Sequence, residues 1–149
     1  MEITEKQIVE IADNLDAGMI CYYNLKTGEI KSVPDFDSRP YAEEEAWEDD
    51  LEIIDDNRKD YFKFTGFESR ENFRIMVDFA ESIEDKKIQA KLFDALDKPK
   101  PFKNFKFQID NSGEYRSKWF EYKAMRQIQN IKEQIDDKNS DDESSDLAD

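Results

Sequence analysis

The chain has 149 residues and a formal net charge of −15, with no histidine and a single cysteine. The absence of histidine excludes Ser-His and Cys-His catalytic arrangements, and one cysteine excludes an intramolecular disulfide framework. No N-terminal signal pattern is present, and no run approaches the ~18 consecutive apolar residues of a membrane span. We therefore expect a cytoplasmic protein that is not an enzyme and that holds no cofactor or metal.

The net charge is concentrated in two segments. Residues 35–60 contain 12 acidic and 3 basic side chains, residues 136–149 contain 7 acidic and 1 basic, and the remainder is balanced with 18 of each sign. The spacing of Asp49, Asp50, Asp55 and Asp56 in the first segment does not fit a calcium-binding loop. We interpret both segments as solvated acidic surfaces, which bear on partners and not on the fold.

The first predicted elements are a helix and a β-hairpin. Thr4-Glu5-Lys6-Gln7 has the form of a capping box, and apolar residues follow it at helical spacing. Residues 19–25 and 29–33 are rich in strand-forming residues, with a glycine-bearing turn between them. Cys21 lies in the first strand, where we expect it to pack in the core because no partner base is available.

The acidic segment is predicted to contain a short helix. Trp47, Leu51 and Ile54 are spaced by four and three residues, which favours a helical turn or two over residues 43–55. Residues 60–65 alternate well enough to predict a third strand.

The C-terminal half is predicted to be helical. Ser69 is the expected cap of a region with helical spacing over residues 69–96, which fits either two helices or one bent helix. Pro101 is well placed at the first position of the next helix. The last helix is predicted over residues 114–135.

The last predicted helix has two apolar faces. One face carries five aligned residues: Phe120, Ala124, Ile128, Ile131 and Ile135. We expect the first four of them to pack on the domain. The opposite face carries three aromatic residues: Tyr115, Trp119 and Tyr122. We expect these three rings either to fit under the preceding helix or to stay partly exposed for a partner.

Together these elements predict the α+β class. About five helices pack on a small three-stranded antiparallel sheet, formed by the hairpin and one further strand, in a single domain over residues 1–135. Residues 136–149 contain one large apolar residue and are predicted to form a disordered acidic tail.

Residues 98–126 form a basic and aromatic region. They contain eight basic and three acidic side chains, with seven aromatic rings interleaved. This combination is typical of surfaces that bind single-stranded nucleic acid. Helical spacing, however, explains most of the rings as core residues, and a strongly acidic chain repels a polyanion at long range.

Several motifs resemble those of uncharacterised protein family 0158, a bacterial group. They are Tyr22–Ile30, Asp60–Phe64, Met76 with Phe79, Phe102–Lys106 and Trp119–Tyr122. The resemblance covers roughly residues 3–135, and Lys98-Pro99-Lys100-Pro101 stands where a glycine-bearing loop is expected. The resemblance supports one integrated domain and implies no activity, cofactor or catalytic residue.

We therefore expect a non-catalytic module for protein–protein interaction or regulation. The candidate interaction surface comprises Tyr115, Trp119, Tyr122, Lys103, Lys106, Glu44 and Glu48. The alternatives are a nucleic-acid-associated protein that uses residues 98–126, or an acidic mimic of nucleic acid. An enzyme that uses carboxylates and a metal has the weakest support. The sequence predicts no membrane association and identifies neither the protein partner nor the oligomeric state.

Overall fold

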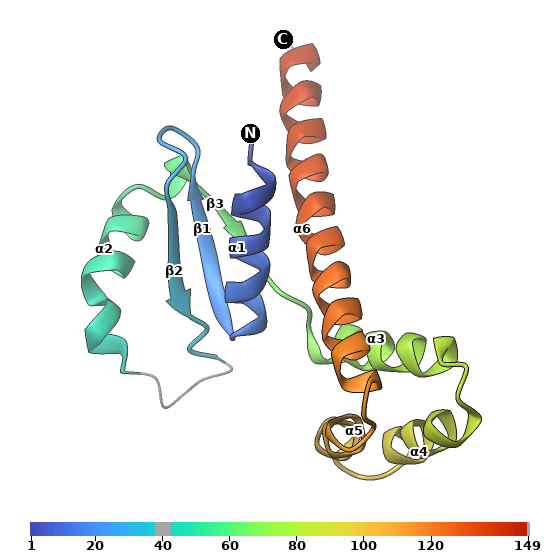
Figure 1. The fold of residues 1–149 in the computed structure, drawn as a ribbon. Helices are drawn as coiled ribbons and strands as arrows, with labels where there is room; N and C mark the ends of the chain where they lie inside the picture. The colour runs from blue at the N-terminus through green and yellow to red at the C-terminus, as the bar shows by residue number, and fades with distance from the viewer. Residues whose placement is uncertain (38–42, 149) are drawn as a thin grey trace. The chain divides into compact units, whose positions relative to one another are not determined.

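The computed structural model describes residues 1–37 and 43–148, with side chains up to residue 143 (Figure 1). The described residues form six α-helices and one three-stranded antiparallel sheet, which confirms the predicted α+β class. The chain divides into two compact units. We call Met1–Gly66 with Gln127–Asp149 the sheet unit and Phe67–Arg126 the helical unit, and describe each by itself. The single domain predicted over residues 1–135 stays a prediction.

Helix α1 (Glu5–Asp16) begins at the predicted capping box. The Thr4 hydroxyl accepts a hydrogen bond from the Gln7 backbone N–H at 3.1 Å, and the Gln7 side-chain oxygen accepts one from the Thr4 N–H at 3.1 Å. The apolar stripe of α1 is buried as its spacing predicts, and it consists of Ile8, Ile11, Ala12 and Leu15.

The sheet has the strand order β2-β1-β3. Its strands are β1 (Met19–Asn24), β2 (Ile30–Pro34) and β3 (Tyr61–Phe64). Cys21 at the centre of β1 lies opposite Ser32 in β2 and Phe64 in β3. Gly28 in the hairpin turn has φ +77°, a conformation that glycine adopts without steric cost.

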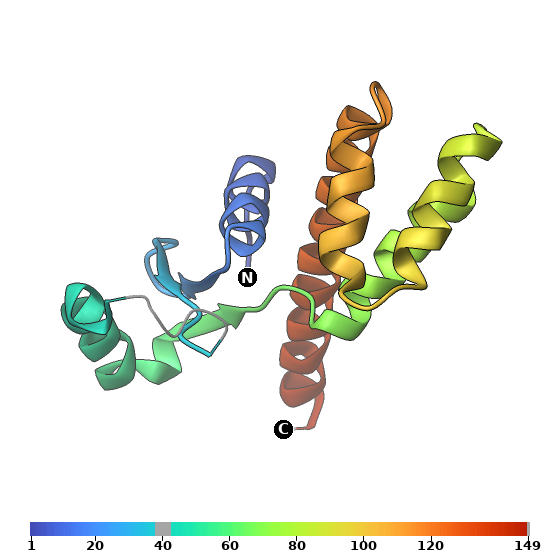
Figure 2. The ribbon, with the colours of Figure 1, turned by 90° about the horizontal axis from the view of Figure 1, so that it is seen from below.

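Helices cover both faces of this sheet (Figures 1 and 2). On one face, α1 and the later part of α6 bury a core that includes Cys21, Tyr23, Phe64 and Ile131. Helix α2 (Glu48–Asp56) packs on the other face, after a 3-10 turn at Glu44–Trp47, and a second 3-10 turn at Arg58–Asp60 leads into β3. The short helix predicted for the acidic segment is therefore confirmed. Residues 38–42 of that segment lie outside the described residues.

The helical unit contains α3 (Ser69–Ser82), α4 (Lys86–Leu96), α5 (Pro101–Asp110) and the first part of α6 (Tyr115–Ala148) (Figure 2). The region 69–96 is thus two helices, because the Asp85 carboxylate caps α4 by accepting from the N–H groups of Lys87 and Ile88 at 3.0 and 3.1 Å. Pro101 is the first residue of α5, as predicted.

The cap predicted for α3 was wrong by one residue. Glu68 occupies the N-cap position, and its backbone N–H donates to the Glu71 carboxylate at 3.4 Å. Ser69 is instead the first helical residue. A capping box built from two glutamates serves the same purpose as the expected serine, because each satisfies a backbone N–H that the helix leaves unpaired.

Rings meet around Trp119 in the core of the helical unit. Its centroid lies 5.2 Å from that of Phe79 and 4.9 Å from that of Phe105. Tyr122 adds a fourth ring, 5.4 Å from Phe79. Aliphatic residues from α3, α4 and α5 complete this core: Ile75, Met76, Ala80, Ile83, Leu92, Leu96 and Ile109.

Helix α6 differs from the prediction in its length and in the residues that it buries. It continues beyond residue 135 to Ala148, through most of the segment predicted to be a disordered tail; Asp149 lies outside the described residues. Phe120 is 46% exposed, so its expected core position was wrong, whereas Ile131 is fully buried as expected. The reason is that the aromatic face of α6 packs in the helical unit and the isoleucine face packs in the sheet unit.

No helix in the described part of the chain has the length and apolar character needed to cross a membrane. The cytoplasmic location stays a prediction.

Candidate functional site

The helical unit has a groove of about 550 Å³ that is lined by residues of α3, α5 and α6. This volume lies within the roughly 300–1,000 Å³ of typical ligand sites. We call it the α3/α5/α6 groove. Its floor and its rim differ in chemistry.

The floor of the groove is apolar. It is formed by core residues that helical spacing brings to one side of each helix: Ile75, Met76, Phe105, Ile109 and Trp119. Met76 has an unbranched, polarizable side chain that adapts to ligands of different shape. Because the remaining residues are held by the packed core, the floor is formed before any ligand arrives.

Two exposed phenylalanines stand beside this floor. Phe102 on α5 is 44% exposed, and Phe120 on α6 is 46% exposed. Both rings leave a large apolar surface in water. Exposed apolar surface that is continuous with a groove and bordered by polar residues marks interaction sites.

The rim is basic. Lys106, Lys123 and Arg116 line the groove together with one acidic residue, Asp110. Arg116 Nε donates to Asp110 Oδ1 at 3.2 Å, and its guanidinium lies 4.9 Å from the centroid of the Phe120 ring. Within the described residues, neither lysine forms an ion pair.

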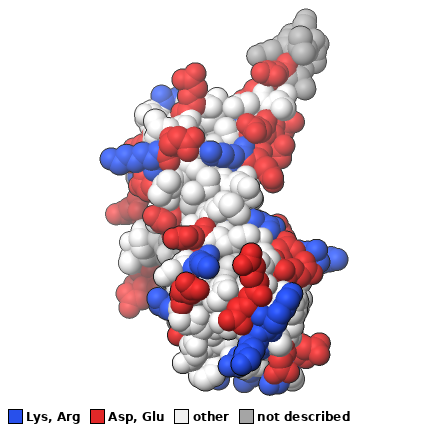
Figure 3. Space-filling model, turned by 45° about the vertical axis from the view of Figure 1, so that its right-hand side comes forward, with Lys and Arg blue, Asp and Glu red and all other residues white. Residues whose placement is uncertain are grey.

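The groove therefore carries two lysines that form no ion pair with any residue that the structure describes. On the face shown in Figure 3, basic and acidic side chains are interspersed over the lower part, where α3, α4 and α5 lie in Figure 1. An excess of positive charge at the groove is thus a local feature.

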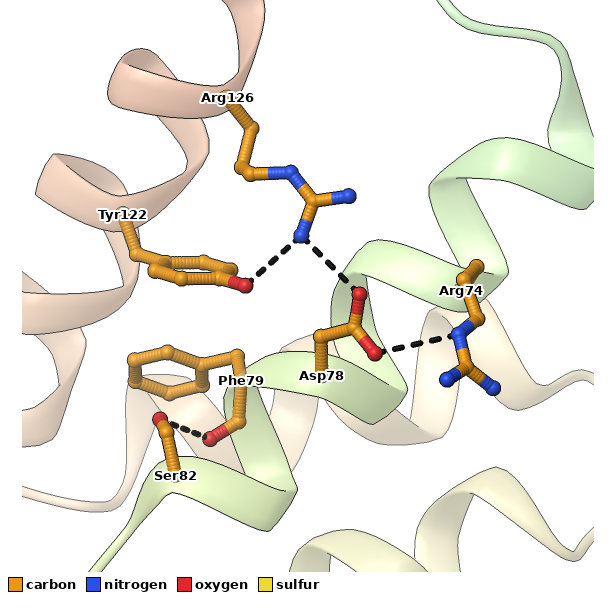
Figure 4. Close-up of polar contacts among 6 residues, drawn as sticks. All are labelled: Arg74, Asp78, Phe79, Ser82, Tyr122 and Arg126. Carbon is orange, nitrogen blue, oxygen red and sulfur yellow. Dashed lines mark hydrogen bonds and ion pairs between the residues drawn. The ribbon is translucent and has the colours of Figure 1, made fainter.

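A polar cluster holds α6 against α3 in the helical unit (Figure 4). Arg126 Nη1 donates to Asp78 Oδ2 at 3.0 Å and to the Tyr122 hydroxyl at 2.8 Å. Asp78 Oδ1 also pairs with Arg74 Nε at 3.1 Å. The hydrogen bond to Asp78 raises the pKa of the Arg126 guanidinium, so this residue stays charged. The cluster links two of the three helices that line the groove.

The structure places the predicted surface residues in different environments. Trp119 is 9% exposed and belongs to the core, so it is not available as a surface anchor. Tyr115 and Tyr122 are half-buried against the same core. Lys103 and Lys106 are both exposed, but only Lys106 lines the groove.

Glu44 and Glu48 lie on the sheet unit and take no part in the groove. Both are exposed, on an acidic surface around Leu51 that the 3-10 turn and α2 form together. Among the described residues, no group of three or more acidic or cysteine side chains is arranged to hold a metal ion. The role of this surface in an interaction stays a prediction.

The candidate interaction surface predicted from the sequence left out Phe102, Phe120 and Lys123, which appeared only within the basic and aromatic region of the nucleic-acid alternative. A usable signal was present, because Phe102 and Lys106 are four residues apart on α5, and Arg116 and Phe120 are four apart on α6. Residues at this spacing share one helix face. When an aromatic residue lies on the same helix face as a basic residue, that aromatic residue can be predicted to be exposed.

Cys21, by contrast, is buried as predicted. The Cys21 Sγ and Ser32 Oγ are 3.3 Å apart, and the side chain is fully inaccessible. Burial raises the pKa of the Cys21 thiol, and the hydrogen bond to Ser32 opposes this effect. The thiol therefore stays protonated at neutral pH and acts as a small apolar core residue.

Comparison with known proteins supports the resemblance noted in the motifs. The model of an uncharacterised protein family, UPF0158, matches residues 7–143. The chain belongs to UPF0158. The match includes both units, and it reaches past residue 135 into the acidic segment that the motifs left outside. No curated protein and no solved structure matches the chain.

Proposed function

We propose that this UPF0158 protein is a non-catalytic protein–protein interaction module and that the α3/α5/α6 groove is its docking site. The observation that carries the proposal is the pair of exposed rings, Phe102 and Phe120, beside an apolar floor that is already formed. Protein interfaces gather most of their binding energy in a few large apolar or aromatic anchors. The groove supplies such anchors and a cavity for those of a partner.

The polar side chains of the groove favour binding over catalysis. They are Asn72, Lys106, Asp110, Arg116 and Lys123. Nucleophilic catalysis requires a nucleophile within hydrogen-bond reach of a base. The one carboxylate of this set, Asp110, is paired with Arg116 instead.

A second candidate function is binding of single-stranded nucleic acid. It is favoured by the exposure of Phe107, which is 63% accessible, and of Phe102 on the same helix as the exposed Lys103 and Lys106. Exposed rings and cations on one surface serve base stacking and phosphate contact. We rank it second because the chain as a whole carries a net charge of −15.

Site-specific photo-crosslinking in the native cell tests the proposal. Benzoylphenylalanine replaces Phe102 or Phe120 in the groove, and Phe93 of α4 serves as the matched control, because it is 37% exposed and does not line the groove. We expect the two groove positions to give the same crosslinked protein, identified by mass spectrometry. The Phe93 position should not give that product.

Two results would contradict the proposal. Equal crosslinking from Phe93 would show that contact with the partner is not specific to the groove. Groove adducts that disappear after nuclease treatment of the crosslinked sample would assign the site to nucleic acid instead.

A further inference from the structure

The rim and floor of the groove also indicate what kind of partner it takes. We infer that the α3/α5/α6 groove binds a short acidic segment of a partner protein, in which large apolar residues are flanked by Asp or Glu. The inference rests on the proposed function and adds the chemistry of the partner to it.

The apolar part of the partner follows from the groove's floor and size. A volume of about 550 Å³ holds a few large side chains and not the face of a globular domain. Peptide segments that dock in apolar grooves do so with anchors from one side of a helix or strand. Phe102 and Phe120 offer such anchors apolar contacts from two different helices, α5 and α6.

The acidic part follows from the rim. Lys106 and Lys123 form no ion pair within the described residues, and they line the groove. Arg116 is already held by Asp110 and by the Phe120 ring. The two lysines therefore remain to pair with carboxylates of the partner, and charge complementarity of this kind accelerates association and selects the partner.

The acidic surface of the sheet unit also favours an acidic partner for the groove over a basic one. A basic partner would be attracted to the acidic surface that the 3-10 turn and α2 form, where Glu44, Glu45 and Glu48 are exposed, and not to the groove. An acidic partner is repelled there and is attracted to the helical unit, whose net charge is slightly positive. The uneven distribution of charge thus favours the helical unit for an acidic segment, and the groove is where that unit offers apolar contacts beside its lysines.

Selection from a displayed library of random short peptides tests the inference on the full-length protein. The wild-type protein is the bait, and the double variant Lys106→Glu, Lys123→Glu is used for counter-selection. The double variant Lys86→Glu, Lys87→Glu is the matched control, because it changes the charge of the same unit equally at exposed positions outside the groove. Far-UV circular dichroism and Trp119 fluorescence verify that both variants fold.

We expect the enriched peptides to combine large apolar residues with Asp or Glu. Synthetic copies should bind the Lys106→Glu, Lys123→Glu variant at least about tenfold more weakly than wild type, and this difference is roughly 1.4 kcal/mol. Their affinity for the Lys86→Glu, Lys87→Glu variant should change much less. Rising salt should weaken binding to the wild-type protein.

Three results would overturn the inference: no enrichment over the counter-selected variant, enriched peptides that are neutral or basic, or equal losses in the two double variants. Displacement of the peptides by an oligouridylate at similar concentration would favour nucleic acid. A groove that crosslinks to a protein from Phe102 and Phe120, yet selects no acidic peptide, would leave the proposed function in place and remove only the acidic partner. Absence of groove-specific crosslinks would instead remove the proposed function itself.

Discussion

The two units differ sharply in charge. The sheet unit contains 26 acidic and 9 basic residues, a net charge of −17, whereas the helical unit contains 11 acidic and 13 basic residues, a net charge of +2. Both units nevertheless bury a normal apolar core. The comparison shows that charge has little to do with how either unit folds. It bears on which surface a charged partner approaches.

The largest loss of stability is expected from a substitution in the core of the helical unit. Phe105→Ala should cost about 3–5 kcal/mol of unfolding free energy, because the ring is 1% exposed and packs on Trp119. Phe107→Ala, two residues along the same helix, should change stability by less than about 0.5 kcal/mol, because its ring is 63% exposed. Urea unfolding followed by fluorescence of Trp119, in a Trp47→Phe background, measures both. Similar costs at the two positions would contradict the assignment of core and surface on α5.

Two variants that each keep one of the two tryptophans test the single domain that the sequence predicts. Trp47 lies in the sheet unit and Trp119 in the helical unit, and these are the only two tryptophans. We expect single-tryptophan variants to report one shared midpoint, since the unbroken helix α6 carries core residues of both units. Two separate midpoints would show that the units fold independently and would contradict the single-domain prediction.

A smaller loss of unfolding free energy is expected when a buried polar residue of the sheet unit is replaced. Gln127 is 3% exposed, its Nε2 donates to Asp16 Oδ1 at 3.0 Å, and its Oε1 accepts from Asn130 Nδ2 at 2.9 Å. Gln127→Ala should cost about 1–3 kcal/mol, because it removes a buried side chain and leaves its partners without these bonds. Gln129→Ala, at an exposed position of α6, is the control and should be nearly neutral. Equal effects would show that the Gln127 network does not stabilise the sheet unit.

Local structure could be predicted from the sequence wherever it depends on residues close together in the chain. The capping box at Thr4, the turn at Gly28 and the helix start at Pro101 each depend on residues a few positions apart, and all three are found as predicted. The strands could be predicted for the same reason, since alternation and turn residues define them locally.

The faces of α6 could not be predicted in this way. The spacing of apolar residues showed that α6 has two apolar faces, but it did not show which parts of the chain pack against each face. Trp119 is buried by Phe79 and Phe105, which lie 40 and 14 residues earlier, whereas Ile131 packs with α1, more than 100 residues earlier. Phe120 was assigned to the core because it aligns with Ile128, although these residues belong to different units. The groove was missed for the same reason, because its exposed rings have the same spacing as core residues.

The net negative charge of the sheet unit should lower the stability of the protein modestly. Asp56→Asn removes an exposed carboxylate from the last residue of α2, and should stabilise the protein by about 0.3–1 kcal/mol at low salt, because both the helix dipole and the neighbouring acids oppose that charge. Glu81→Gln is the matched control near the end of α3 in the nearly neutral helical unit. We expect it to gain less, and the gain at Asp56 to shrink as salt screens the repulsion. Equal gains with equal salt dependence would show that the difference in net charge does not affect stability.

The smallest change in stability is expected from deletion of residues 136–149. The described side chains of this segment are exposed or half-buried, and its main interactions are an exposed pair between Lys138 and Asp142 at 3.0 Å and hydrogen bonds between Asn139 and Met1. Exposed pairs of this kind contribute about 0.2–1 kcal/mol. Deletion also removes seven acidic residues and one basic residue from a unit of net charge −17, which relieves repulsion and opposes that loss.

We therefore expect the thermal midpoint to stay almost unchanged at physiological salt, and a drop of several degrees would show that the segment docks on the fold. Far-UV circular dichroism tests whether residues 136–149 are helical. Because α6 continues to Ala148, the deletion should remove helical signal in proportion to the residues lost, even though stability barely changes. An unchanged helical signal would instead favour the disordered tail predicted from its composition.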